Sequence, residues 1–92
     1  MRANSAISEG GNTMQKFTED FIRRLQNDLE VEVVDARNLE VVGAANTYLL
    51  EIMPDGYIHY IEYGEAINEG YTQYELVILD WIQDAESVWA VA

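Results

Sequence analysis

The segment from residue 47 to 63, TYLLEIMPDGYIHYIEY, constrains the fold of this chain more than any other segment. Two runs rich in β-branched, leucine and tyrosine residues flank a turn. In that turn Pro54 presets φ, Asp55 can bond the following backbone, and Gly56 can adopt a left-handed conformation. This pattern predicts a β-hairpin. We expect the hairpin to provide the sheet on which amphipathic helices from both ends of the chain bury their apolar faces.

The turn also predicts which residues face each other across the hairpin. With Met53 opposite Tyr57, Ile52 pairs with Ile58, and a slip of one residue would invert both faces of the sheet. Both faces are substantially apolar, although a sheet covered on one side normally alternates apolar and polar positions. We therefore predict a homodimer, or an exposed aromatic patch that awaits a partner. The predicted oligomer face comprises Leu49, Met53, Tyr57, Ile61 and Tyr63.

Residues 14–29 have the apolar periodicity of an amphipathic helix. Asn12 is the predicted N-cap, and Gln15 follows three residues later, as in a polar variant of the capping box. Residues 1–13 show no apolar face, so we expect a flexible tail before a single domain of residues 14–92. The predicted buried arc of the helix comprises Met14, Phe17, Phe21, Ile22, Leu25 and Leu29.

A second amphipathic helix is predicted after residue 72. Thr72 and Glu75 have the spacing of a capping box, in which the side chains of both residues cap the start of one helix. Leu76 and Leu79 fall outside the apolar arc, and we expect them to be exposed. The arc comprises Tyr74, Val77, Ile78, Trp81, Ile82, Ala85, Val88 and Trp89.

The remaining segments set the predicted number of strands. In residues 30–36, acidic and valine residues alternate before two consecutive valines, which predicts a strand. Residues 39–45 predict a short strand, with an irregular return to the hairpin as the alternative. Residues 64–71 are bounded by glycines and predict a loop. The predicted fold class is α+β: an N-terminal helix, an antiparallel sheet of three or four strands built on residues 47–63, and a C-terminal amphipathic helix.

Charge is distributed unevenly along this chain, which has a formal net charge of −12 at pH 7. Its five lysine and arginine residues all lie in the first 37 positions, whereas residues 38–92 carry ten carboxylates. A surface of one sign attracts a cationic partner, and Asp80 and Asp84, one helical turn apart, can take the place of phosphates. The alternative is a homo-oligomeric accessory protein whose acidity serves solubility. The predicted partner-binding acidic residues are Glu65, Glu69, Glu75, Asp80, Asp84 and Glu86.

No arrangement of residues in the sequence predicts catalysis, a cofactor or a metal site. His59 is the only histidine, and an ion pair with Glu51 across the hairpin is the expected role. The chain has no cysteine, which excludes disulfides and thiolate–zinc sites. No segment is apolar for long enough to predict a membrane span. We therefore expect a cytoplasmic, non-enzymatic protein without cofactors.

The order helix, strands, helix resembles that of the double-stranded-RNA-binding domain. That family grips phosphate with a lysine cluster at the start of its second helix. The matching positions here run from Thr72 to Glu75, and no lysine or arginine follows Arg37. The charge therefore argues against direct nucleic-acid binding. We expect a protein-binding module, with an inhibitor that blocks a partner's basic nucleic-acid-binding surface as the leading hypothesis. Phage anti-defence proteins and nuclease antidotes are similar in size and charge.

Overall fold

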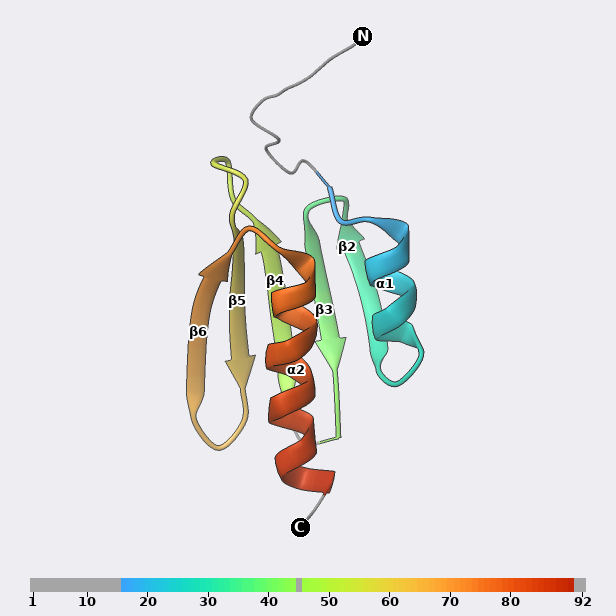
Figure 1. Cartoon of the computed structure of the whole chain (residues 1–92), viewed down its shortest axis with the longest axis vertical. Coiled ribbons are helices and arrows are strands. Elements are labelled where there is room, and N and C mark those ends of the chain that lie inside the picture. The colour runs from blue at the N-terminus through green and yellow to red at the C-terminus, as the bar shows by residue number, and fades with distance from the viewer. Residues whose placement is uncertain (1–15, 45, 91–92) are drawn as a thin grey trace, which may run out of the picture.

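The computed structural model describes residues 16–44 and 46–90 of the chain. Within these residues, two helices lie on one face of a five-stranded antiparallel sheet, which confirms the α+β class (Figure 1). The predicted tail of residues 1–13 lies outside the described residues. The strands lie side by side in their order along the chain. The elements are α1 (Glu19–Gln26), β2 (Glu30–Asp35), β3 (Asn38–Val42), β4 (Thr47–Ile52), β5 (Ile58–Tyr63), β6 (Ile67–Thr72) and α2 (Glu75–Ala90).

Strands β4 and β5 form the predicted hairpin in the predicted register, with Ile52 opposite Ile58. At the turn, the Met53 N–H donates a hydrogen bond of 2.7 Å to the Tyr57 carbonyl. Gly56 has a φ of 89°, in the left-handed region that glycine adopts without steric cost. The turn therefore fixes which side chains of the two strands face the helices.

The strands predicted at residues 30–36 and 39–45 are confirmed as β2 and β3. Strand β3 ends at Val42, and the Gly43 N–H then donates a 2.9 Å hydrogen bond to the Asn46 carbonyl. This bond closes the connection to β4. Because Asn38–Val42 form a strand, the alternative of an irregular return to the hairpin is wrong.

The described residues form five strands rather than three or four, because residues 67–72 form β6 where a loop was predicted. Strand β6 lies at an edge of the sheet and pairs with β5. Gly70 faces the helix layer, and a Cβ atom there would lie 3.0 Å from Cη2 of Trp81. Thr72, on the same side of the strand, is buried but polar. Glycine and threonine at these positions remove the apolar alternation from which strands are predicted.

Helix α1 is shorter than predicted and starts later, at Glu19. Its N-cap is Thr18, whose hydroxyl accepts a 3.2 Å hydrogen bond from the Phe21 N–H. Just before the cap, the Phe17 N–H donates to the Ala36 carbonyl at 3.1 Å, so the chain is tied to the end of β2 before the helix begins. The predicted capping residues Asn12 and Gln15 lie outside the described residues.

Helix α2 confirms most of the predicted arc. Ile78 and Ile82 are buried, and Leu76 is 64% exposed as expected. Leu79 was expected to be exposed but is partly buried against the core, because α1 lies beside this side of α2 (Figure 1). Tyr74 was placed in the arc, but it precedes the helix and is 65% exposed. Of the remaining arc residues, Val77, Trp81 and Ala85 are partly buried, and the side chains of Val88 and Trp89 lie outside the described ones.

The hydrophobic core lies between the helices and the sheet. Side chains from both helices meet alternating residues of the central strands, which is the arrangement expected for a two-layer α+β fold. Among the described residues, the buried hydrophobic side chains are Phe17, Phe21, Leu25, Leu39, Val41, Tyr48, Leu50, Ile52, Ile58, Tyr60, Ile78 and Ile82.

Candidate functional site

The face of the sheet opposite the helices carries apolar side chains that remain exposed. On β3 to β6, its central row has Glu40 opposite Leu49, Leu49 opposite Ile61, and Ile61 opposite Glu69. A carboxylate thus stands at each end of an apolar pair. We call this surface the open sheet face. On strands β3 to β6 it comprises Asn38, Glu40, Val42, Thr47, Leu49, Glu51, His59, Ile61, Tyr63, Ile67, Glu69 and Tyr71.

The apolar residues of the open sheet face are substantially exposed. Leu49 is 37% exposed, Tyr63 40% and Ile67 65%. Apolar residues scattered singly over a surface are normal, but neighbours at paired strand positions form a continuous patch, and such patches mark interaction sites. Of the predicted oligomer face, Leu49, Ile61 and Tyr63 lie on this surface. Met53 and Tyr57 lie at the hairpin turn beyond the ends of β4 and β5, where Met53 is partly buried and Tyr57 is 39% exposed.

His59 lies on the open sheet face, and its main partners come from β6. Its Nε2 lies 3.2 Å from Oε1 of Glu69, and its ring stacks on Tyr71 with a centroid distance of 4.5 Å and an interplanar angle of 7°. Glu51 is the cross-strand neighbour of His59 in the register, as predicted, but the imidazole contacts the carboxylate of Glu69 instead. The sequence could not predict this pair because β6 was not recognised as a strand.

Two of the six predicted partner-binding carboxylates hold the fold together. Glu86 accepts a 2.6 Å hydrogen bond from the Tyr48 hydroxyl and a 2.9 Å bond from the Ala44 N–H. These bonds tie α2 to β4 and to the connection that follows β3. Burial and the hydrogen bond to Glu86 raise the pKa of Tyr48, because both disfavour the charged phenolate.

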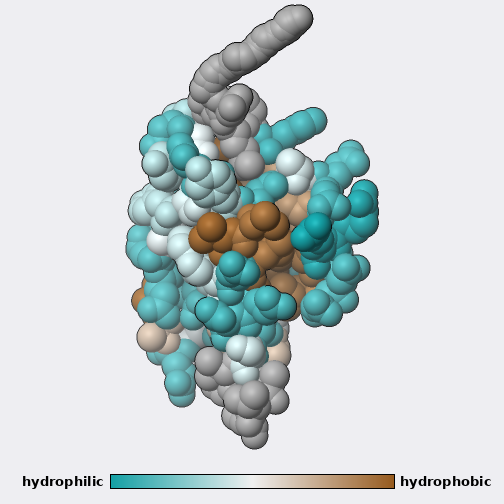
Figure 2. Space-filling view, in the orientation of Figure 1, coloured by the Kyte–Doolittle hydropathy of each residue, from teal (hydrophilic) through white to brown (hydrophobic). Residues whose placement is uncertain are grey.

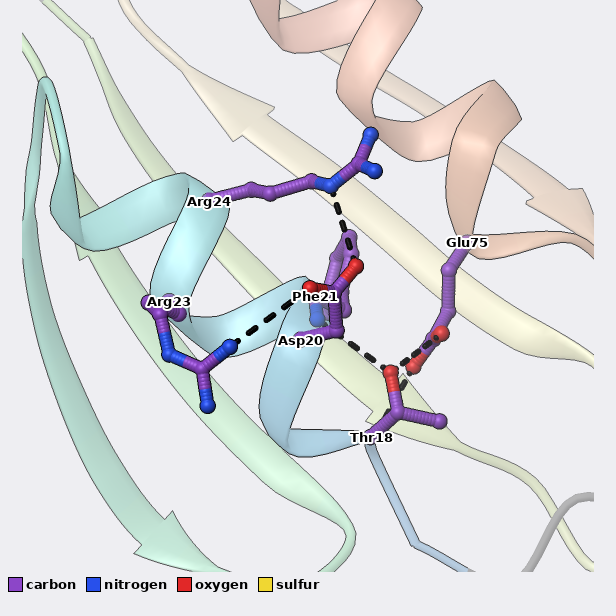
Figure 3. A network of polar contacts seen from close by, with 6 residues as sticks. All are labelled: Thr18, Asp20, Phe21, Arg23, Arg24 and Glu75. Atoms are coloured by element: carbon purple, nitrogen blue, oxygen red, sulfur yellow. Dashed lines mark hydrogen bonds and ion pairs between the residues drawn. The ribbon is translucent and has the colours of Figure 1, made fainter.

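Glu75 is the second structural carboxylate, and it interacts with α1 (Figure 3). Its Oε2 accepts from the Thr18 N–H at 2.9 Å, and its Oε1 accepts from the Thr18 hydroxyl at 2.8 Å. The predicted capping box between Thr72 and Glu75 is therefore wrong. The Thr72 hydroxyl instead accepts a 3.2 Å hydrogen bond from the Tyr74 N–H.

The other four predicted carboxylates do not share one surface. Glu65 lies in the connection between β5 and β6, and Glu69 lies on the open sheet face. Asp80 and Asp84 lie on exposed positions of α2, on the opposite side of the sheet (Figure 1). The acidic residues therefore supply charge to two different faces of the molecule.

A groove with a volume of about 770 Å³ runs between α1 and α2. Figure 2 shows an apolar patch on this side of the molecule, surrounded by hydrophilic side chains. The groove was not predicted from the sequence. Its signal in the sequence is the pair Leu76 and Leu79, two apolar residues that lie outside the expected apolar arc of α2 and line the groove. The groove is lined by Arg24, Leu25, Asp28, Leu29, Ala44, Leu76, Leu79, Asp80, Ile82, Gln83, Glu86 and Ser87.

Within the described residues, no group of three or more histidine, cysteine or acidic side chains could hold a metal ion. Of the described helices, none is long and apolar enough to cross a membrane. No family model, curated protein or solved structure matches this chain. The candidate sites are thus the open sheet face and the groove between the helices.

Proposed function

We propose that this domain is a non-enzymatic protein-binding module that docks through the open sheet face onto a basic surface of its partner. The observation that carries the proposal is the central row of that face, in which the apolar pair Leu49 and Ile61 stands between the carboxylates of Glu40 and Glu69. Protein interfaces commonly have an apolar centre and a polar rim. The open sheet face has this composition.

The charges of this face favour a basic partner. Besides Glu40 and Glu69, it carries Glu51, and none of the residues that define it is lysine or arginine. A cationic surface would be attracted by these carboxylates, and its association would be faster at low ionic strength. A basic surface with exposed apolar groups is typical of proteins that hold nucleic acid. The role we propose is therefore inhibition, in which the domain occupies that surface, as phage-encoded antagonists and nuclease antidotes do.

A homodimer formed through the same face is the second candidate, and the exposure of Leu49, Tyr63 and Ile67 favours it. A symmetric interface would place the carboxylates of two copies near one another without a lysine or arginine on the face to compensate them. The charge of the face therefore favours a basic partner over a second copy.

The test uses the full chain, with two variants that change the net charge equally. Glu40→Lys/Glu69→Lys alters the open sheet face, whereas Glu19→Lys/Asp84→Lys alters exposed positions on the helices that do not line the groove. Each chain is used to capture proteins from the native host at low and high salt. The captured proteins are identified and assayed for nucleic-acid binding with and without the domain.

We expect the wild-type chain and the helix variant to capture a nucleic-acid-binding protein and to displace its nucleic acid. The sheet variant should lose this capture, and salt should weaken the wild-type complex as the Debye length falls below about 10 Å. Equal loss in both variants would show that total charge, not the open sheet face, carries binding. A dimer in sedimentation velocity that Leu49→Ser dissociates would favour the second candidate.

A further inference from the structure

The groove between α1 and α2 has an apolar floor that the helices do not cover completely. Leu25 and Ile82 are buried at its base, whereas Leu76 is 64% exposed at its edge. An exposed leucine next to a hollow of about 770 Å³ leaves apolar surface that an occupant could remove from water. Figure 2 shows this apolar patch on the helix side of the molecule, away from the open sheet face.

The edges of the groove carry unbalanced negative charge. Asp28 and Asp80 line it, and their carboxylates have no hydrogen-bond or ion-pair partner among the residues that the structure describes. Arg24 also lines it, but the Arg24 Nε is held at 3.0 Å from Oδ2 of Asp20 (Figure 3). The carboxylate of Glu86, which also lines the groove, accepts hydrogen bonds from the Tyr48 hydroxyl and the Ala44 N–H. The free charge at the groove is therefore acidic.

We infer that this groove is a docking site for a basic amphipathic helix of a partner protein. Apolar residues at i, i+3, i+4 and i+7 of such a helix would pack between the ridges of α1 and α2, over Leu76 and Leu79. Lysine or arginine residues at the borders of that apolar stripe would lie near Asp28 and Asp80. A small ligand needs a more enclosed site, because the exposed edge at Leu76 would leave part of it in water. The inference concerns a surface that the proposed function does not use.

The probe is a fluorescently labelled synthetic peptide of about 18 residues, or five helical turns, with leucines along one face and lysines elsewhere. Its control has the same composition in scrambled order, so that no face is apolar. Binding to the full chain is measured by fluorescence anisotropy. The variants are Leu76→Ser and Asp80→Lys in the groove, with Val33→Ser as the matched control, because Val33 is an exposed residue of β2 that belongs to neither the groove nor the open sheet face. Circular dichroism melting checks that each variant is folded.

The two peptides carry equal charge, so a difference in their affinity reports the apolar face. We expect the amphipathic peptide to bind about tenfold more tightly than the scrambled one. Leu76→Ser and Asp80→Lys should each weaken its binding about fivefold, whereas Val33→Ser should leave it unchanged. Equal binding of the two peptides would overturn the inference, as would a loss in Val33→Ser that matches the loss in Leu76→Ser. Tighter binding of a monomeric cationic amphiphile, dodecyltrimethylammonium, would assign the groove to a small ligand instead. Because Leu49 and Leu76 lie on opposite faces, failure here is distinguishable from failure of the proposed function.

Discussion

Glu75, the first residue of α2, completes the N-terminal cap of α1 by accepting hydrogen bonds from both the backbone N–H and the hydroxyl of Thr18. In a capping box within one helix, a glutamate three residues after the cap accepts from the backbone N–H of the cap residue. That position in α1 is occupied by Phe21, which is buried in the core. The carboxylate therefore comes from another helix, and the cap also joins the N-terminal ends of α1 and α2 (Figure 3).

This shared cap predicts coupled stability effects. Thr18→Ala should lower the free energy of unfolding by about 1 kcal/mol, as for other N-caps, and Glu75→Ala should have a similar effect. Because both substitutions remove the bond between the Thr18 hydroxyl and Oε1 of Glu75, the double variant should cost less than the sum of the two by at least about 0.5 kcal/mol. Urea unfolding of the four chains measures this. Glu19→Ala combined with Thr18→Ala is the control, and additive losses for Thr18 and Glu75 would contradict the shared cap.

The effects of substitutions at Gly70 and Trp81 on stability should be coupled, and the coupling should depend on the size of the side chain at position 70. A Cβ at Gly70 would meet the Trp81 ring, so Gly70→Val should destabilise the fold by about 1–3 kcal/mol through overpacking. Trp81→Ala should cost about 3 kcal/mol, since the ring also packs on Tyr60 at a centroid distance of 5.2 Å. Gly70→Val should cost less when Trp81 is already alanine.

Thermal and urea unfolding of the Gly70–Trp81 series test this prediction. Glu69→Val is the matched control, because it places valine on the same strand but on the open sheet face. It should show no coupling to Trp81→Ala. If Gly70→Val lowers the free energy of unfolding equally with and without the Trp81 ring, the contact with the ring is not what limits the size of residue 70. The backbone of β6 would then set that limit.

The buried tyrosines predict a loss of stability at alkaline pH. Burial raises the pKa of both Tyr48 and Tyr60, and hydrogen bonds to Glu86 and Glu62 act in the same direction. Above a pH of about 10, the unfolded chain releases these protons before the folded one does, so rising pH favours unfolding. Each tyrosine should contribute a slope of up to about 1.4 kcal/mol per pH unit, and this contribution is absent below pH 10.

Urea unfolding between pH 8 and about 11.5 measures that slope. Tyr48→Phe should lower stability at neutral pH by about 1–2 kcal/mol, because Glu86 loses one of its two donors. The same variant should show a shallower loss above pH 10 than the wild-type chain. An unchanged slope would mean that the Tyr48 hydroxyl does not stay protonated in the folded chain.

The sequence alone was sufficient to predict those parts of the fold that depend on near neighbours in the chain. The register of β4 and β5 followed from the turn at Pro54 to Gly56, because two closely spaced strands and one turn geometry leave a single pairing. The burial of Ile78 and Ile82 followed from helical periodicity. These signals are local, and they do not depend on where other elements pack.

The features that local sequence patterns do not reveal depend on contacts between distant segments. Strand β6 was not predicted because Gly70 and Thr72 break its apolar alternation, and the close approach of the Trp81 ring, which favours glycine at position 70, is not visible in any local pattern. Glu75 was predicted to cap its own helix, and both Glu75 and Glu86 were predicted to bind a partner, but these carboxylates accept hydrogen bonds from Thr18 and Tyr48. Their roles come from the packing of α2 on the rest of the fold. The groove arose in the same way, from the position of α1 beside α2.

The order of the strands in the sheet has a consequence for how the chain folds. Each strand from β2 to β6 pairs with its immediate neighbours in sequence, so the sheet can form hairpin by hairpin with short loop closures. The bonds from Thr18 to Glu75 and from Tyr48 to Glu86 span 57 and 38 residues, and both involve α2. Loop-closure entropy therefore places the docking of α2 late in folding. Substitutions at Glu75 and Glu86 should accelerate unfolding while leaving the rate of folding nearly unchanged.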